Sequence, residues 1–234
     1  MVCLLSIETS THSFSCALHQ NGKLAAMEES ISDQTTASML AVMLDKLFVD
    51  AQIKKNQLNG VAVAAGPGSY TGLRIGVATA KGICYSLGIP LVSVNTLYLM
   101  AHQVLKSSPS LLERGSGGEV LCPMLDARRM EVYCTLFDKD LHLIEPTQAK
   151  VIDEASFSQH LETQQIYFFG EGSDKCREII KHPNAKFISG IKPSAVTLGA
   201  IGFQKFSNSE FEDLEHFEPF YLKDFIVKKP NSVS

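Results

Sequence analysis

The sequence predicts an α/β fold of two similar halves, each a mixed sheet with helices. An apolar segment that ends in an acid and runs into a hairpin occurs twice, at 2–8 and at 120–126. Helical and strand-like segments alternate after each hairpin, as in layered α/β domains. A segment rich in Ser, Gly and Pro, residues 107–119, lies between the two halves and is the predicted linker.

The two halves share a register as well as a pattern. Glu8 aligns with Asp126, 118 residues later, and Cys16 aligns with Cys134 at the same offset. The offset is about half of the 234 residues, so one structural unit used twice is the preferred interpretation. Because β-hairpins resemble one another, a chance likeness is the alternative.

The predicted first half, residues 1–106, begins with three strands joined by tight turns. Asn21-Gly22 is a strong signal for the second of these turns. After the strands, the apolar spacing changes from alternation to a helical period. The expected elements are strands at 2–8, 13–20 and 23–30, a helix at 35–51, a strand at 60–66, a helix at 69–87, a strand at 89–94 and a helix at 95–106.

The predicted second half, residues 120–207, repeats this order. Its acidic and aromatic tail, residues 208–234, is expected to pack back on the first half. The expected elements are strands at 120–126, 131–137 and 141–146, a helix at 153–162, a strand at 165–170, a helix at 173–182, a strand at 186–189 and a helix at 194–207.

The composition is that of a globular protein without a basic surface. Hydrophobic residues make up 45% of the chain and charged residues 20%, with a formal net charge of -4. A dedicated nucleic-acid-binding domain would normally be basic. The N-terminus has no basic leader, and no apolar run reaches the roughly 18 residues of a membrane span. Six cysteines without CxxC pairs favour reduced thiols, so we expect a cytoplasmic protein with no membrane partner.

A glycine-rich segment at 64–82, AAGPGSYTGLRIGVATAKG, spans a predicted strand-to-helix junction. Its spacing matches neither a P-loop nor the dinucleotide fingerprint. Gly72, Gly76 and Ala80 lie four residues apart and leave one helix face bare. Three interpretations are open: packing within this chain, close contact with a partner helix, or a phosphate site at the helix N-terminus after Ser69.

The predicted helix at 35–51 supports the partner interpretation. Its apolar residues span roughly 180° of the helical wheel, whereas a surface helix needs a stripe of only about 100°. The excess could be covered by this chain or by another subunit. The predicted partner interface is Met39, Val42, Met43, Leu47, Gly72, Leu73, Gly76 and Ala80.

Candidate chemical groups are few. Glu8 and Asp126 are strand-end acids that could hold a metal, a water or a nucleotide, or could cap the following turns. Arg128 and Arg129 could hold a phosphate, or could be solvated turn residues. No HxxxH pair, GxSxG motif or metal-ligand cysteine spacing occurs, so no catalytic residue and no metal site are expected. The weaker candidates for anion or nucleotide contacts are Glu8, Thr9, Ser10, Gly66, Gly68 and Ser69.

Four segments together resemble one family. IETST at the end of the first strand, GPGSYTGLRIG, DARRMEVY and the closing PFYLK are similar in order and spacing to the TsaB (YeaZ-like) family over nearly the whole chain. The resemblance implies an actin-like ATPase (ASKHA) fold of two RNase H-like halves. It also implies a role in threonylcarbamoylation of adenosine 37 in ANN-decoding tRNAs.

The resemblance also implies that this chain is not the catalyst. The related catalytic subunit TsaD carries an HxxxH pair on its first helix, whereas the matching segment here, DQTTASMLAVMLDKL, has no histidine. The implied role is a scaffold that pairs with a TsaD-like subunit through the helices at 35–51 and 69–87. A TsaE-like ATPase is implied to join the pair, and the tRNA is reached through the complex.

Two further expectations accompany this role. The apolar helix pair predicts a homodimer when the chain is alone, and no cofactor is expected to bind tightly. Any ATP or ADP is expected at the subunit junction of the complex. The alternative function is an autonomous small ASKHA-type phosphotransferase or hydrolase that uses Glu8 and Asp126.

Overall fold

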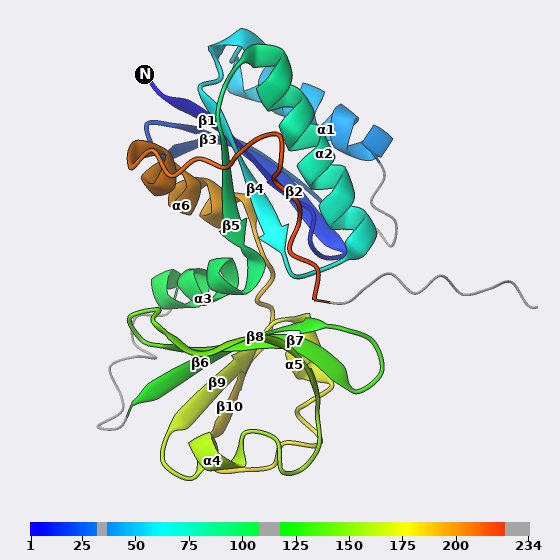
Figure 1. Cartoon of the computed structure of the whole chain (residues 1–234), viewed down its shortest axis with the longest axis vertical. Helices are drawn as coiled ribbons and strands as arrows, with labels where there is room; N and C mark the ends of the chain where they lie inside the picture. The colour runs from blue at the N-terminus through cyan, green and yellow to red at the C-terminus, as the bar shows by residue number, and fades with distance from the viewer. Residues whose placement is uncertain (32–36, 108–117, 223–234) are drawn as a thin grey trace, which may run out of the picture.

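The architecture was analysed in a computed structural model that describes residues 1–31, 37–107 and 118–222. The two halves each contain one five-stranded mixed sheet, and they are stacked along the long axis of the molecule (Figure 1). Most of the predicted linker, and the first residues of the predicted helix at 35–51, lie outside the described residues.

The two sheets have the same topology. In each, the first strand is central, with the hairpin strands antiparallel on one side and two parallel strands on the other. This confirms the predicted α/β class and its two similar halves. The first sheet has the order β3-β2-β1-β4-β5 and consists of β1 (Cys3–Glu8), β2 (Ser13–Gln20), β3 (Lys23–Ile31), β4 (Gly60–Gly66) and β5 (Leu91–Asn95). The second has the order β10-β9-β6-β7-β8 and consists of β6 (Glu119–Asp126), β7 (Glu131–Asp138), β8 (Leu143–Val151), β9 (Gln165–Phe169) and β10 (Ala185–Ile188).

Both faces of the first sheet are covered by helices. Helices α1 (Ala37–Ala51) and α2 (Tyr70–Leu87) cover the face that carries Leu5 and Ile7 of β1. Helix α6 (Ala195–Ser207) covers the opposite face, which carries Leu4. The alternation along β1 therefore supplies one apolar core on each side of the sheet.

Two helices tie the halves together. Helix α3 (Thr96–Ser107) follows β5 in sequence but contributes Leu97 and Met100 to a core with the second sheet. Helix α6, which the sequence assigns to the second half, packs on the first sheet through Leu198 and Ile201. Gly202 allows this close approach, because a Cβ there would lie 2.7 Å from Cβ of Ala62.

Two predicted helices of the second half are wrong in length. The helix expected at 153–162 is reduced to α4 (Ser158–Leu161), because Phe157 adopts a left-handed φ of 64° just before it. This conformation places the Phe157 ring in the core against Phe168. The helix expected at 173–182 is reduced to α5 (Glu171–Asp174) followed by turns. A further short element, the 3-10 turn η1 (Lys55–Gln57), follows α1.

The described part of the tail, residues 208–222, lies along the first half and is called the strap below (Figure 1). The Phe220 amide donates to the carbonyl of Ala65. Lys81 Nζ on α2 donates to the carbonyls of Glu215 and Phe217 at 3.1 and 2.9 Å. The strap therefore covers one flank of α2. Within the described residues, no helix is long and apolar enough to cross a bilayer.

The turn between β1 and β2 packs tightly on α2. Thr9 Oγ1 donates to the carbonyl of Gly72 at 2.8 Å. A Cβ at Gly72 would overlap the Thr9 carbonyl oxygen, and a Cβ at Gly76 would overlap Thr9 Oγ1. Of the three interpretations of the glycine stripe, the structure supports packing within the chain.

This contact generates a stability prediction. We expect Gly76→Ala to lower the free energy of unfolding by about 1–3 kcal/mol, because the added methyl overpacks the turn. Urea denaturation of the two proteins checks this. The matched control is Gly82→Ala on the same helix, where nothing lies within 4 Å of a Cβ and which should gain up to about 1 kcal/mol. Thr9→Ala in the Gly76→Ala background should restore part of the loss; equal stability losses from both alanines would contradict the packing account.

Candidate functional site

The predicted anion-binding residues come together where the β1–β2 turn meets the start of α2. Their polar atoms are largely used within the chain. The Ser69 amide donates to the Ser10 carbonyl at 2.7 Å, and Ser69 Oγ caps α2 by accepting from the Gly72 amide at 3.3 Å. A Cβ at Gly68 would overlap the Ser10 carbonyl. The turn thus packs directly against the start of α2 and takes up the Ser69 amide.

Gly66, the remaining residue of this set, lies against the strap. Its φ is 104°, and a Cβ there would lie 2.7 Å from the carbonyl oxygen of Phe220. The glycine therefore permits the close approach of the strap to the end of β4.

Glu8 is a buried carboxyl group at the end of β1. Burial raises its pKa to about 7, although hydrogen bonds from the Ser10 amide and hydroxyl to Oε1, at 2.6 and 2.5 Å, oppose the shift. The second oxygen, Oε2, has no hydrogen-bond partner among the described residues. Because Glu8 is fully buried, an anion in solvent cannot reach either of its carboxyl oxygens.

Glu8 should therefore make stability depend on pH. The folded state holds its proton up to about pH 7, whereas the unfolded chain releases it near pH 4.5, so stability falls as pH rises through this window. We expect Glu8→Gln, which cannot ionise, to gain stability relative to the unmodified protein by up to about 3 kcal/mol between pH 5 and pH 8. Urea unfolding at both pH values, with exposed Glu154→Gln as the control, measures this. A difference that stays the same at the two pH values would show that Glu8 ionises freely.

Asp126 occupies the equivalent position in the second half but is exposed. Its Oδ1 accepts from the Arg128 amide at 3.0 Å and forms an ion pair with Lys175. Both strand-end acids thus accept hydrogen bonds from the turn that follows them. This supports the turn-capping interpretation that the sequence left open.

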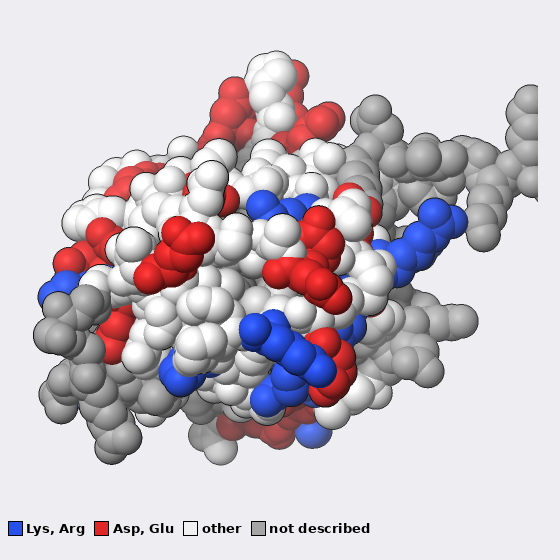
Figure 2. Space-filling view, turned by 90° about the horizontal axis from the view of Figure 1, so that it is seen from below, with Lys and Arg blue, Asp and Glu red and all other residues white. Residues whose placement is uncertain are grey.

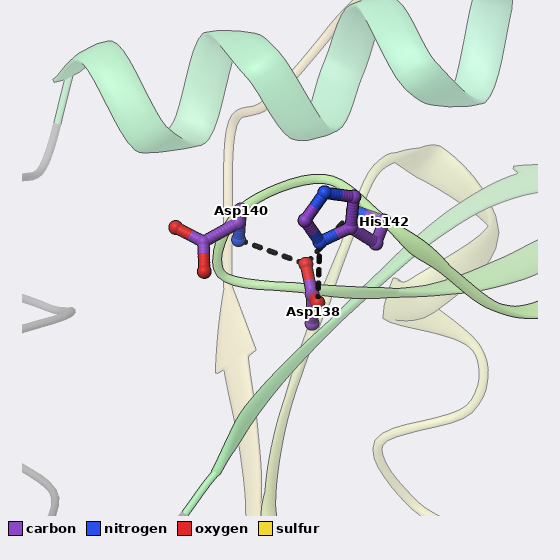
Figure 3. A group of neighbouring side chains, drawn as sticks. All are labelled: Asp138, Asp140 and His142. Atoms are coloured by element: carbon purple, nitrogen blue, oxygen red, sulfur yellow. Dashed lines mark hydrogen bonds and ion pairs between the residues drawn. The ribbon is translucent and has the colours of Figure 1, made fainter.

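One group of possible metal ligands lies within the described residues, at the turn between β7 and β8 (Figure 3). Asp138 Oδ1 accepts from the amides of Asp140 and His142, both at 2.8 Å. Asp138 Oδ2 lies 3.1 Å from His142 Nδ1. Burial alone would raise the pKa of Asp138, but these hydrogen bonds outweigh it and lower the pKa. The hydrogen bonds of this cluster stabilise the turn between β7 and β8.

An apolar groove separates α1 from α2, and we call it the α1–α2 groove. Its volume is about 400 Å³. It is lined by Ala37, Ala41, Leu44, Asp45, Phe48, Lys55, Leu58, Thr79, Ile83, Ser86 and Leu87. Beside it, α1 exposes Val42 and Val49, and α2 exposes Tyr85, with 69%, 73% and 85% of each residue accessible.

The predicted partner-interface residues divide into two groups. Met39 and Met43 are half-buried on α1, and Val42 is exposed. The other five, Leu47, Gly72, Leu73, Gly76 and Ala80, are buried within the chain. The side chains of Leu47, Leu73 and Ala80 face the core, and the β1–β2 turn packs on Gly72 and Gly76, which corrects their placement on an outer surface.

Sequence reasoning missed the exposed small residues of α2. Ala78 and Gly82 lie four residues apart on the outer side of the helix, in line with Arg74 and Tyr85. A helical wheel places this row opposite Gly72 and Gly76. The sequence therefore contains a second row of small residues on α2. Only the packing of the β1–β2 turn on Gly72 and Gly76 decides that the first row faces inward.

The comparisons with known proteins agree with this fold. The family model for TsaD, tRNA N6-adenosine threonylcarbamoyltransferase, matches residues 30–230. The TsaB protein of Escherichia coli, named for tRNA threonylcarbamoyladenosine biosynthesis, is 28% identical over 97% of this chain and 96% of its own. The Bacillus subtilis TsaB is 31% identical over 61% of this chain and 58% of its own.

A solved structure extends the agreement to three dimensions. YeaZ from Pseudomonas aeruginosa superposes with a TM-score of 0.77 and 21% identity, covering 95% of this chain and all of that one. At this identity the likeness concerns the fold. Together with the family model that matches 201 of the residues, these findings show that the chain belongs to the TsaB (YeaZ-like) family and has a role in tRNA threonylcarbamoyladenosine biosynthesis.

Proposed function

We propose that this chain is a non-catalytic scaffold subunit that pairs with a TsaD-like catalytic subunit through the α1–α2 groove. The carrying observation is the apolar surface of the two helices. A groove of about 400 Å³ opens between them, and Val42, Val49 and Tyr85 are exposed on the same two helices. Exposed apolar surface marks protein–protein interfaces in soluble proteins.

The shape of this surface fits a helix. Ala41 on α1 and Ala78 and Gly82 on α2 are exposed and small, which lets a partner backbone approach closely. The half-buried Met39 and Met43 are also on α1, and Met43 packs against the core beneath this helix. A four-helix contact, with two helices from each subunit, satisfies these features. The same surface supports self-association of this chain when the partner is absent.

Two features of the described residues support the scaffold role. Helix α1 contains no histidine, and the β1–β2 turn packs against the start of α2. The alternative, an autonomous nucleotide-dependent phosphotransferase or hydrolase, would need Glu8 and Asp126 in an open cleft. Instead, Glu8 is buried and Asp126 is paired with Lys175. A TsaE-like ATPase, tRNA, and ATP or ADP at the subunit junction complete the proposed complex.

The docking surface yields a direct prediction. Val42→Glu adds a charge to an exposed position, so we expect unchanged folding but at least tenfold weaker binding to the TsaD-like subunit, about 1.4 kcal/mol or more. Calorimetry with the purified subunits measures the affinity. Leu143→Glu, at an exposed apolar position in the second half, is the matched control and should bind normally. Normal binding by Val42→Glu would place the interface elsewhere.

Reconstitution tests the function itself. The partners, tRNA, threonine, bicarbonate and ATP are combined with or without this chain, and threonylcarbamoyladenosine is quantified in the recovered tRNA. We expect the product to fall to background without the chain and to stay low with Val42→Glu at concentrations below its weakened affinity. Undiminished product in the omission would refute the scaffold role. Nucleotide hydrolysis by the chain alone that is lost in Glu8→Gln would favour the autonomous enzyme.

A further inference from the structure

The turn between β6 and β7 carries two adjacent arginines in an unfavourable backbone conformation. Arg128 and Arg129 have φ angles of 70° and 50°. Residues other than glycine rarely adopt such backbone angles, and asparagine and aspartate tolerate them better than arginine does. A turn selected for stability alone would favour Gly or Asn at these positions. Two consecutive arginines at such positions suggest a role for their side chains.

The main chain of this turn is braced by one lysine. Lys175 Nζ forms an ion pair with the Asp126 carboxylate and donates to the carbonyls of Arg129 and Glu131 at 2.6 and 2.7 Å. The same Asp126 carboxylate accepts from the Arg128 amide. The brace fixes the turn, and Lys175 pairs with the Asp126 carboxylate at its start.

The two guanidinium groups are free to bind a ligand. Both residues are exposed. No hydrogen bond or ion pair of either side chain is recorded among the described residues, although their backbone atoms take part in the brace. Each guanidinium offers five N–H donors in a planar fork that matches the oxygens of a phosphate. Two such forks on a braced turn form a compact cationic tip.

The tip lies at the junction of the two halves, near the β1–β2 turn. Burial raises the pKa of Glu171, His12 lowers it and Asp126 raises it, so His12 and Asp126 both lie within electrostatic range of this carboxylate. His12 belongs to the β1–β2 turn, which packs on α2. The arginine turn is thus on the side of the second half that faces the β1–β2 turn of the first half.

On the face shown in Figure 2, Lys and Arg are interspersed with Asp and Glu, and no broad basic area is visible. With a net charge of -4, the chain as a whole does not attract a polyanion. Any contact with nucleic acid must therefore be local and must come from a few positioned cations.

We propose that the Arg128–Arg129 turn contacts the phosphodiester backbone of the tRNA held by the complex. This rests on the proposed function, because the scaffold brings the turn to the RNA only as part of the assembly. Adjacent phosphates supply closely spaced anionic groups along one strand, which suits two neighbouring guanidinium forks. The contact positions the RNA and carries no sequence information.

The test uses the assembled complex and an unmodified transcript of an ANN-decoding tRNA, with affinity measured over a series of KCl concentrations. The variant Arg128→Asn/Arg129→Gly removes both charges and supplies residues that accept left-handed angles, so it should melt at or above the temperature of the unmodified protein. We expect RNA affinity at low salt to fall several-fold. The slope of log affinity against log salt should become shallower by about 1 to 2, because each phosphate contact releases roughly one counterion.

Two variants make the result specific. Lys181→Gln/Lys186→Gln removes two charges from exposed lysines of the same half and should leave the slope unchanged. Arg128→Lys/Arg129→Lys keeps the charges and should keep most of the slope. Equal slopes for the arginine-less and lysine-less complexes would overturn the proposal. The proposal would also be overturned if the Arg128→Asn/Arg129→Gly variant weakened subunit assembly but left RNA affinity unchanged. That result would show that the arginines pair with carboxylates of a protein partner. A failure of the proposed function can be told apart from this result, because the unmodified chain would then not assemble with the TsaD-like subunit at all.

Discussion

The close contact between the β1–β2 turn and α2 determines which face of α2 the first half exposes to solvent. Thr9 packs against Gly72 and Gly76, and the hydrogen bond from Thr9 Oγ1 to the Gly72 carbonyl holds the turn against α2. With that face of α2 turned inward, the row of Arg74, Ala78, Gly82 and Tyr85 must face outward. The orientation of α2 relative to α1, and with it the groove between them, follows from a contact that only a residue without a side chain permits.

Local sequence patterns predict much of the architecture. Alternating apolar residues, the Asn21-Gly22 turn and the half-length repeat were enough to predict both sheets and most helices. The failures were of another kind. A helical wheel identifies a bare stripe but cannot say whether it faces a turn or a partner, so the sequence leaves both interpretations of Gly72 and Gly76 open. Phe157 interrupts a helix because its ring is needed in the core, which is a tertiary demand that local propensity does not contain.

The candidate site shows the same division between pattern and environment. Glu8 and Asp126 are equivalent by sequence, yet one is buried with a raised pKa and the other is exposed and paired with Lys175. The polar residues around the β1–β2 turn suggested an anion site because their types are right. Several of their polar atoms instead bond to one another, as in the hydrogen bonds from Ser10 to Glu8 and from the Ser69 amide to the Ser10 carbonyl. The sequence could indicate which residues meet, but the three-dimensional contacts decide whether they bind one another or a ligand.

The exchange of helices between the halves has a consequence for biosynthesis. Helix α6 is the last regular element of the described chain, yet it covers the face of the first sheet that carries Leu4, Ala62 and Val92. A ribosome releases the strands of this sheet long before it releases α6. The nascent first half therefore waits, with one apolar face uncovered, until nearly the whole protein has been made. Two halves that look like successive domains must in this respect complete their folding together.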